Sequence, residues 1–223
     1  MGSPIHPVRR GEITCKALGM AVDVLDERGA SVLQQKGDLV CTVPFPSMPL
    51  TFWGEDGDER YHSSYFEQRP GIWTHGDFAE QTVEQSLIIY GRADTTLNPG
   101  GVRIGTAEIY RVLEQMPEIK DSLVFGIPNE GDEEIVLCVV AQDGIISEEL
   151  ATYIRRNIRD NASPRHLPRR IYTVQEIPYT VNGKKVEGAA RSTVLGQQVK
   201  NKGSLSNPNS LVDYETLLER NYV

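Results

Sequence analysis

One segment of the chain combines residue types that suit phosphate chemistry. Residues 91–109 read as a strand end, a glycine-rich loop that contains Arg92 and Arg103, and the start of a helix. Glycine lets a ligand approach the backbone closely. Arginine side chains and the amides of a helix N-terminus both suit phosphate groups. A structural turn with two solvated arginines gives the same pattern, so the residues alone leave both interpretations open.

A lysine and an aspartate extend this set of candidates. Lys184 follows a glycine in a short loop. An ammonium group there can stabilise negative charge that develops on phosphoryl oxygens, although a lysine in a surface loop is ordinarily solvated. Asp77 also follows a glycine. Its carboxylate can accept two hydroxyl hydrogen bonds at once, but an isolated Gly-Asp pair predicts only a turn.

Composition limits the class of protein. The 223 residues are 39% hydrophobic and 24% charged, which is typical of a globular protein. The net charge of −8 disfavours nucleic acid as a partner but permits a local cationic pocket for nucleotides. No run of 18 apolar residues occurs, so we expect no membrane association, and the first residues lack the apolar core of a signal peptide.

The three cysteines and four histidines show no metal-ligand spacing. We therefore expect no dedicated metal site. The cysteines lie in apolar or strand-like runs, and we expect them to be reduced structural residues of a cytosolic protein.

The elements that must position these candidates differ between the two halves of the chain. The first half is rich in short strand-like runs that end at glycine or proline turns. The second half alternates helices with buried strands, as apolar spacing indicates. These features predict an α/β (α+β) chain with a boundary near Asp94. The expected strands are 12–18, 20–25, 38–43, 86–90, 122–128, 134–140 and 169–174; the expected helices are 106–116, one beginning at Ser147, one after Lys184, and a closing helix after a polar stretch at 200–210.

The segment 91–109 resembles the hinge motif of the adenylate-forming superfamily, which contains acyl-CoA synthetases, luciferases and peptide-synthetase adenylation domains. It meets the pattern Gly-Arg-x-Asp-x-x-x-[Lys/Asn]-x-x-Gly-x-Arg-[Ile/Leu]-x-x-x-Glu-[Ile/Val] at every fixed position. The resemblance implies that Arg92 contacts the ribose hydroxyls of ATP or AMP and that Asp94 is the hinge between two domains.

The same resemblance assigns roles to other residues in the second half. Gly100 and Gly101 would flank the tunnel for the pantetheine arm of CoA, and Arg103 would face the nucleotide phosphate. Arg155 lies on a helix where acetyl-CoA synthetases carry a residue that touches the 3′-phosphate of CoA. Because the similarity is looser there, a solvated helical face remains an alternative for Arg155.

Two further segments carry the resemblance. Residues 71–78 resemble the family's [Tyr/Trp]-x-[Thr/Ser]-Gly-Asp segment, which implies that Asp77 accepts hydrogen bonds from both ribose hydroxyls; His75 replaces the usual Thr or Ser. Residues 178–187 resemble the family's Pro-x-Thr-x-x-Gly-Lys loop. The resemblance implies that Lys184 is the catalytic lysine that reaches the α-phosphate and the acid carboxylate, and we expect Lys185 to be exposed.

Details of sequence favour one branch of this superfamily. The runs at 40–53, 73–78 and 183–187 look like acetoacetyl-CoA synthetases, as does a tail that contains Ser206-Asn207-Pro208. The implied activity is an ATP-dependent acid–CoA ligase that converts acetoacetate, ATP and CoA to acetoacetyl-CoA through an acyl-adenylate, with Mg²⁺ carried by ATP. A ligase of acetate or propionate, and a non-catalytic lid or interaction remnant, remain alternatives.

The resemblance also implies that part of the site lies elsewhere. Family members bind the triphosphate with a Ser/Thr/Gly-rich loop that does not occur in residues 1–70. We expect residues 1–93 to be the β-rich end of the large adenylation domain and residues 94–223 to be the mobile lid with an extended tail. The missing N-terminal region would supply the adenine contacts and the acyl pocket, so we expect the isolated chain to be inactive.

Overall fold

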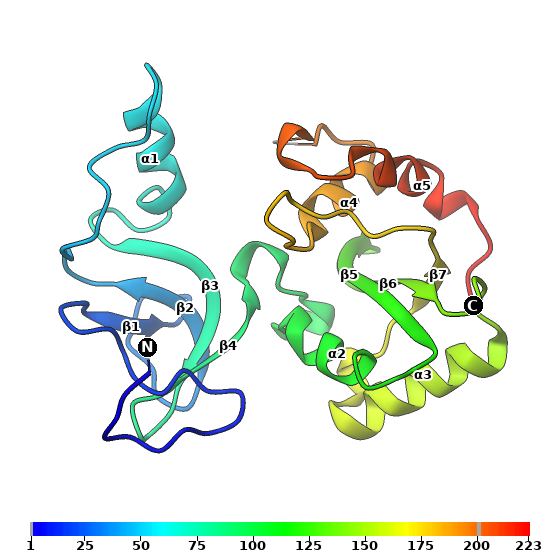
Figure 1. Ribbon diagram of the computed structural model, residues 1–223, viewed down its shortest axis with the longest axis horizontal. Helices are drawn as coiled ribbons and strands as arrows, with labels where there is room; N and C mark the ends of the chain where they lie inside the picture. The colour runs from blue at the N-terminus through cyan, green and yellow to red at the C-terminus, as the bar shows by residue number, and fades with distance from the viewer. Residues whose placement is uncertain (1, 200–201) are drawn as a thin grey trace. The chain divides into compact units, whose positions relative to one another are not determined.

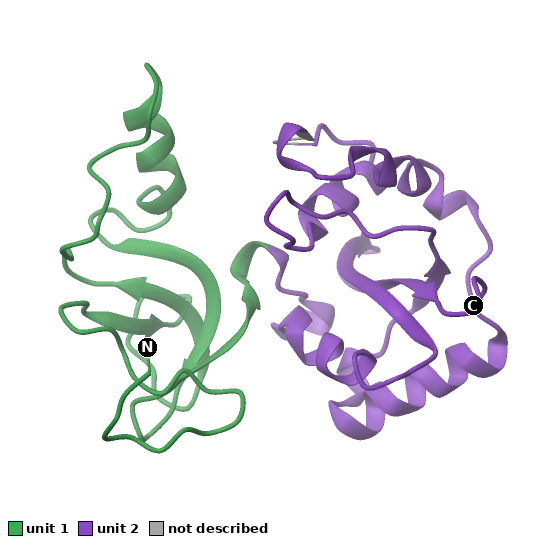
Figure 2. Cartoon of the chain, in the orientation of Figure 1, with its two compact units in different colours: residues 1–94 green, residues 95–223 purple. Residues whose placement is uncertain are grey.

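The computed structural model describes residues 2–199 and 202–223, which form two compact units that divide after Asp94 (Figure 2). The first unit contains residues 1–94 and the second contains residues 95–223. No helix among the described residues is long and apolar enough to cross a membrane.

The first unit is built on an antiparallel sheet of four strands in the order β1-β2-β3-β4 (Figure 1). These strands are β1 (Val22–Leu25), β2 (Lys36–Cys41), β3 (Trp73–Gln81) and β4 (Leu87–Arg92), with helix α1 (Gly57–Tyr65) between β2 and β3. A β-bulge shifts the β3–β4 register between Phe78 and Ala79, and beyond it Asp77 pairs with Arg92. Local sheet geometry therefore brings two of the candidate residues side by side.

The second unit has a sheet of three strands, β5 (Ile119–Asn129), β6 (Asp132–Ala141) and β7 (Arg170–Thr173). β5 and β6 form a long antiparallel hairpin, whereas β7 runs parallel to β6. A parallel neighbour requires a crossover connection, and helix α3 (Glu148–Asn161) lies within that connection.

Helices cover both faces of this sheet (Figure 1). Because successive strand residues point to opposite faces, Val124 packs with α3 and with α2 (Thr106–Leu113) in one cluster. Its neighbours Leu123 and Phe125 belong to a second cluster with α4 (Glu187–Val194) and α5 (Val212–Glu215). The second unit is thus a three-layer α/β/α arrangement.

The start of α3 confirms the helix expected at Ser147. The Ser147 hydroxyl oxygen accepts a hydrogen bond from the N–H of Leu150 at 3.2 Å, which satisfies one of the free donors of the first turn. Glu148 and Glu149 occupy that turn, where the helix dipole favours negative charge.

Most expected elements are present, and the exceptions have local causes. Residues 12–18 form no strand: within this run Ile13 makes an isolated bridge to Leu87, and the run offers few apolar side chains to bury. The expected closing helix is only four residues long: it is α5, which lies between two 3-10 turns. Neither α1 nor β3 was expected. Of the polar stretch 200–210, residues 200 and 201 lie outside the described residues.

The packing of α3 allows a test of the second unit's core. Ile154 is fully buried in the cluster that joins α3 to the sheet, whereas its neighbour Tyr153 is 47% exposed. We expect Ile154→Ala to lower the free energy of unfolding by about 2–5 kcal/mol, because it leaves a cavity. Tyr153→Ala, the control, should change it by about 0.5 kcal/mol or less. Urea titration followed by far-UV circular dichroism measures both; equal effects would contradict the assigned core.

Candidate functional site

The first unit joins Asp77 and Arg92 at paired positions of β3 and β4. The Arg92 Nη1 atom lies 3.6 Å from Asp77 Oδ1, and Arg92 Nε lies 3.2 Å from Asp94 Oδ1. His75 Nδ1 lies 2.7 Å from Asp77 Oδ2. Each carboxylate oxygen can accept more than one hydrogen bond, so Asp77 keeps acceptor capacity for ligand hydroxyls.

Gly76 makes this arrangement possible. Its φ of 84° lies in the left-handed region, and a Cβ atom there would approach Arg92 Nη2 to 2.7 Å. Glycine avoids both the backbone strain and this contact. The Arg92 side chain can therefore lie against the backbone at 75–76, where its Nη1 donates to the carbonyl oxygen of His75 at 3.3 Å.

A hollow of about 470 Å³ adjoins the pair within the first unit. Ser64, Tyr65, Trp73, His75 and Arg92 line it. The rings of Tyr65 and Trp73 stack at 3.7 Å between centroids. This hollow combines aromatic surface with a guanidinium and a nearby carboxylate, a combination that suits a polar ligand with hydroxyl groups.

The glycine-rich loop lies in the second unit, where acidic side chains accept hydrogen bonds from its backbone. Backbone hydrogen bonds in both directions between Leu97 and Ile104 close the loop. At its turn, the N–H of Gly100 donates to Asp132 Oδ1 at 2.7 Å. The N–H groups of Glu133 and Gly100 lower the pKa of Asp132, so its carboxylate stays charged and retains the loop.

Gly100 and Gly101 have φ values of 59° and 74°, and a Cβ atom at either would meet no protein atom within 4 Å. Glycine is required there by backbone conformation and leaves open space beside the chain. Arg103 follows on the same loop and is half-buried.

Arg155 has a structural use. Its Nη2 donates to the carbonyl oxygens of Val223 at 2.7 Å and Arg169 at 3.3 Å, and its Nε donates to that of Pro168 at 3.2 Å. These bonds fasten α3 to the segment that enters β7. The guanidinium is therefore neither simply solvated nor uncommitted, and a role for Arg155 in CoA binding stays a prediction.

Lys184 lies in a tight turn of residues 178–186, which we call the lysine hairpin. The N–H of Thr180 donates to the Lys184 carbonyl oxygen at 2.8 Å, and the N–H of Lys184 donates to Thr180 Oγ1 at 3.1 Å. Gly183 has a φ of 72°, which glycine adopts without strain. The backbone of Lys184 is thus fixed while its side chain is exposed.

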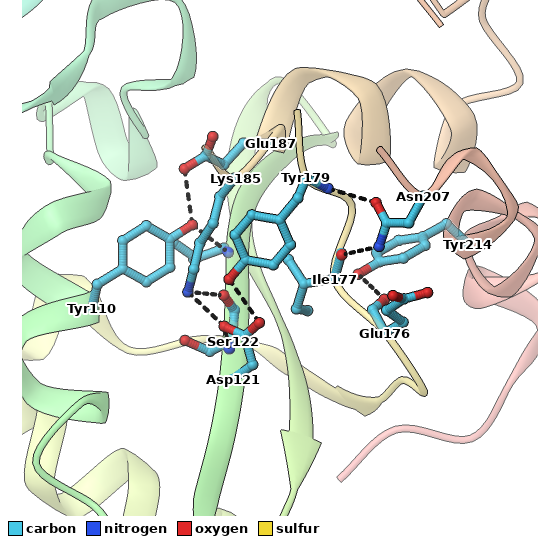
Figure 3. A network of polar contacts seen from close by, with 11 residues as sticks. Tyr110, Asp121, Ser122, Glu176, Ile177, Tyr179, Lys185, Glu187, Asn207 and Tyr214 are labelled. Carbon is cyan, nitrogen blue, oxygen red and sulfur yellow. Dashed lines mark hydrogen bonds and ion pairs between the residues drawn. The ribbon is translucent and has the colours of Figure 1, made fainter. Parts of the chain in front are cut away.

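A single carboxylate on β5 binds both arms of the lysine hairpin (Figure 3). Lys185 Nζ lies 2.8 Å from Asp121 Oδ1, and the Tyr179 hydroxyl donates to Asp121 Oδ2 at 2.8 Å. Burial and the bond to Asp121 raise the pKa of Tyr179, so its hydroxyl stays protonated and donates. Lys185 Nζ also donates to the carbonyl oxygen of Ser122 at 2.6 Å. Asp121 therefore clips the base of the hairpin to the sheet.

Tyr110 of α2 completes this network. Lys185 Nζ lies 4.5 Å from the centre of the Tyr110 ring, and the Tyr110 hydroxyl donates to Glu187 Oε1 at 3.0 Å (Figure 3). The same hydroxyl accepts the N–H of Val124 at 3.1 Å. Helix, strand and hairpin are therefore tied together around one lysine side chain.

The expectation that Lys185 is exposed is wrong. Its side chain is 23% exposed and is paired within the network. Successive residues of an extended chain point in opposite directions, and this alternation was the signal that separates an outward Lys184 from an inward Lys185. Asp121 and Tyr179 carried no comparable signal, because nothing local indicates which carboxylate meets which hairpin.

The described residues assemble the candidates into separate groups. Asp77, Arg92 and Asp94 meet in the first unit, whereas Gly100, Gly101 and Arg103 share one loop of the second unit. Among residues 2–199 and 202–223, no group of three or more His, Cys, Asp or Glu side chains could hold a metal ion.

Comparisons with known proteins show which proteins this chain resembles. The profile of the AMP-binding enzyme C-terminal domain matches residues 108–184. The acetoacetyl-coenzyme A synthetase of Rhizobium meliloti (strain 1021) is 49% identical over 212 residues, which are 95% of this chain and 33% of that protein. The acetoacetyl-CoA synthetase of Rattus norvegicus is 42% identical over 216 residues, 96% of this chain and 32% of the relative.

One solved structure is similar to this chain over almost its whole length. The acetoacetyl-CoA synthetase from Streptomyces lividans superposes with a TM-score of 0.87 at 39% identity, covering 94% of this chain and 32% of that one. The chain therefore spans about a third of the length of the relatives it matches.

The Asp121 clip generates a test. We expect Asp121→Ala to speed amide hydrogen exchange at Thr180 by roughly tenfold or more, because two charge-assisted bonds to the hairpin are lost. Asp143→Ala, at an exposed turn, is the control. Exchange measured by NMR on the isolated chain would contradict the assigned clip if both variants matched the parent.

Proposed function

We propose that this chain, which is homologous to the C-terminal part of acetoacetyl-CoA synthetases, is the C-terminal part of an ATP-dependent ligase that forms acetoacetyl-CoA from acetoacetate, ATP and CoA. The observation that carries the proposal is the 49% identity across 95% of the chain. The N-terminal region that the relatives possess would supply the triphosphate loop and the acyl pocket.

In the first proposed step, the acid carboxylate attacks the α-phosphorus of ATP and pyrophosphate leaves. The carboxylate of Asp77 accepts hydrogen bonds from the ribose hydroxyls. Arg92 orients the Asp77 carboxylate and also contacts the ribose. Lys184 stabilises the negative charge that develops on the α-phosphate and the attacking oxygens. The exposed ammonium on a fixed backbone supports this role. Mg²⁺ arrives bound to ATP.

In the second proposed step, the thiol of CoA attacks the acyl carbon of the adenylate and AMP leaves. Residues 95–223 act as a lid that turns about Asp94, withdrawing Lys184 and presenting Gly100 and Gly101 to the pantetheine arm. Hinges absorb such motion at a few residues between rigid elements. The division of the chain after Asp94 supports this assignment. Arg103 faces the nucleotide phosphate, and Arg155 contributes to CoA binding.

Complementation tests the proposed activity. We expect the isolated chain to form no thioester, and a chimera of the N-terminal two thirds of the Rhizobium meliloti relative with this chain to form acetoacetyl-CoA. Coupled assay of AMP release with acetoacetate, acetate and propionate measures the activity and the acid preference. A chimera that folds but forms no thioester from any of the three acids would contradict a catalytic role and favour a remnant. Because the chimera's acyl pocket comes from the relative, a full-length chain that carries this sequence and prefers acetate would contradict the acetoacetate assignment.

Lys184→Ala tests whether Lys184 serves the adenylation step and not the thioester-forming step. Loss of one charge-stabilising group costs about 10²–10³ in the step it serves, so we expect a fall of that size in pyrophosphate release. Thioester formation from preformed acyl-adenylate should remain within about twofold, because Lys184 is withdrawn in that step. Val181→Ala, at an exposed position of the same hairpin, is the control. Equal losses in both half-reactions would count against the assignment.

A further inference from the structure

The tail of the chain adds a strand to the lysine hairpin. The N–H of Val181 donates to the carbonyl oxygen of Ser204 at 3.1 Å, and the N–H of Ser206 donates to that of Tyr179 at 2.9 Å. Thr180 and Leu205 form the intervening antiparallel bridge. The arm of the hairpin that leads to Lys184 is therefore paired on its outer side by residues 204–207, which we call the tail strand.

Asn207 continues this ladder with its side chain. Its Oδ1 atom accepts the N–H of Tyr179 at 2.9 Å, and its Nδ2 atom donates to the carbonyl oxygen of Ile177 at 2.9 Å (Figure 3). A carboxamide offers one acceptor and one donor group, as a peptide unit does. Asn207 thus takes the place of a backbone residue in the pairing, and aspartate of equal size could not, because it lacks the donor.

The conformation of Asn207 is itself fixed. Pro208 follows it, and proline disfavours the helical conformation in the preceding residue; Asn207 has φ −134° and ψ 64°. The Asn207 carbonyl oxygen accepts both the N–H of Ser210 at 3.0 Å and the Ser210 hydroxyl at 2.7 Å. On either side, Leu205 and Leu211 are buried against Ala189 of α4. The side-chain carboxamide of Asn207 is therefore positioned by contacts within the tail and not by its bonds to Tyr179 and Ile177.

We propose that Asn207 is a positioning residue for Lys184, and that through it the tail controls the adenylation step. Asp121 binds the base of the hairpin from the sheet side, and the tail strand with Asn207 binds the incoming arm from the opposite edge. Beyond these supports lie the tip of the hairpin and the exposed side chain of Lys184. This inference rests on the proposed role of Lys184 in adenylation.

Asn207→Ala and Asn207→Asp test the inference against Asn209→Ala. Asn209 is the same residue type two positions on, and its exposed side chain makes no hydrogen bond to any described residue. On the isolated chain, NMR should show faster amide exchange at Tyr179 in Asn207→Ala, by roughly tenfold. Asn207→Asp should retain that protection and lose only the hydrogen bond to the carbonyl oxygen of Ile177, the residue just before the hairpin.

In the complemented enzyme, we expect Asn207→Ala to lower the kcat of pyrophosphate release by about 10- to 100-fold, as small displacements of a catalytic group do. The KM for ATP and the rate of thioester formation from preformed acyl-adenylate should not change. Asn207→Asp should also lower the kcat of pyrophosphate release, and Asn209→Ala should have the kcat of the parent. A purely structural role would lower both half-reactions together with the melting temperature.

Lys184→Ala in the same assay separates the two claims. If it leaves adenylation unchanged, the proposed role of Lys184 fails and the inference with it. If Lys184→Ala slows adenylation but Asn207→Ala does not, or if Asn207→Ala slows both half-reactions equally, the role of Lys184 stands and the positioning role of Asn207 is overturned.

Discussion

The carboxylate of Asp121 receives a hydrogen bond from one arm of the lysine hairpin and an ion pair from the other, through Tyr179 and Lys185. A short hairpin has too few internal contacts to be rigid on its own. By binding side chains from both arms, one carboxylate on a central sheet lends the hairpin the rigidity of the sheet. The side chain of Lys184 is then free to move while its attachment point is not.

The same principle recurs in the first unit. Asp77 and Arg92 lie on neighbouring strands whose register is set by a β-bulge, and Gly76 leaves room for the guanidinium. Charged groups held by paired strands lose less entropy on binding a ligand than groups on free loops. Each unit thus carries its own preorganised set of polar groups, which fits a proposal in which one lid serves two successive half-reactions.

Sequence reasoning succeeded where a pattern is local and failed where partners come from far along the chain. Apolar spacing located α2, α3 and the strands of the second sheet, and the cap at Ser147 followed from its residue type. The strand that carries Asp77 was missed, because Gly76 and several polar residues hide its alternation. Lys185 contacts Asp121, Ser122 and Tyr110, which all lie 63 or more positions away along the chain. No local rule predicts such pairings, since they depend on how the sheet and helices pack.

In the proposed mechanism, Asp121 affects adenylation only through Lys184. A double-mutant cycle measures this directly, because coupled residues give non-additive effects. Pyrophosphate release should be compared in the complemented enzyme carrying Asp121→Ala, Lys184→Ala or both. We predict that Asp121→Ala slows release in the parent and has no further effect once Lys184 is alanine. Full additivity of the two losses would contradict the account.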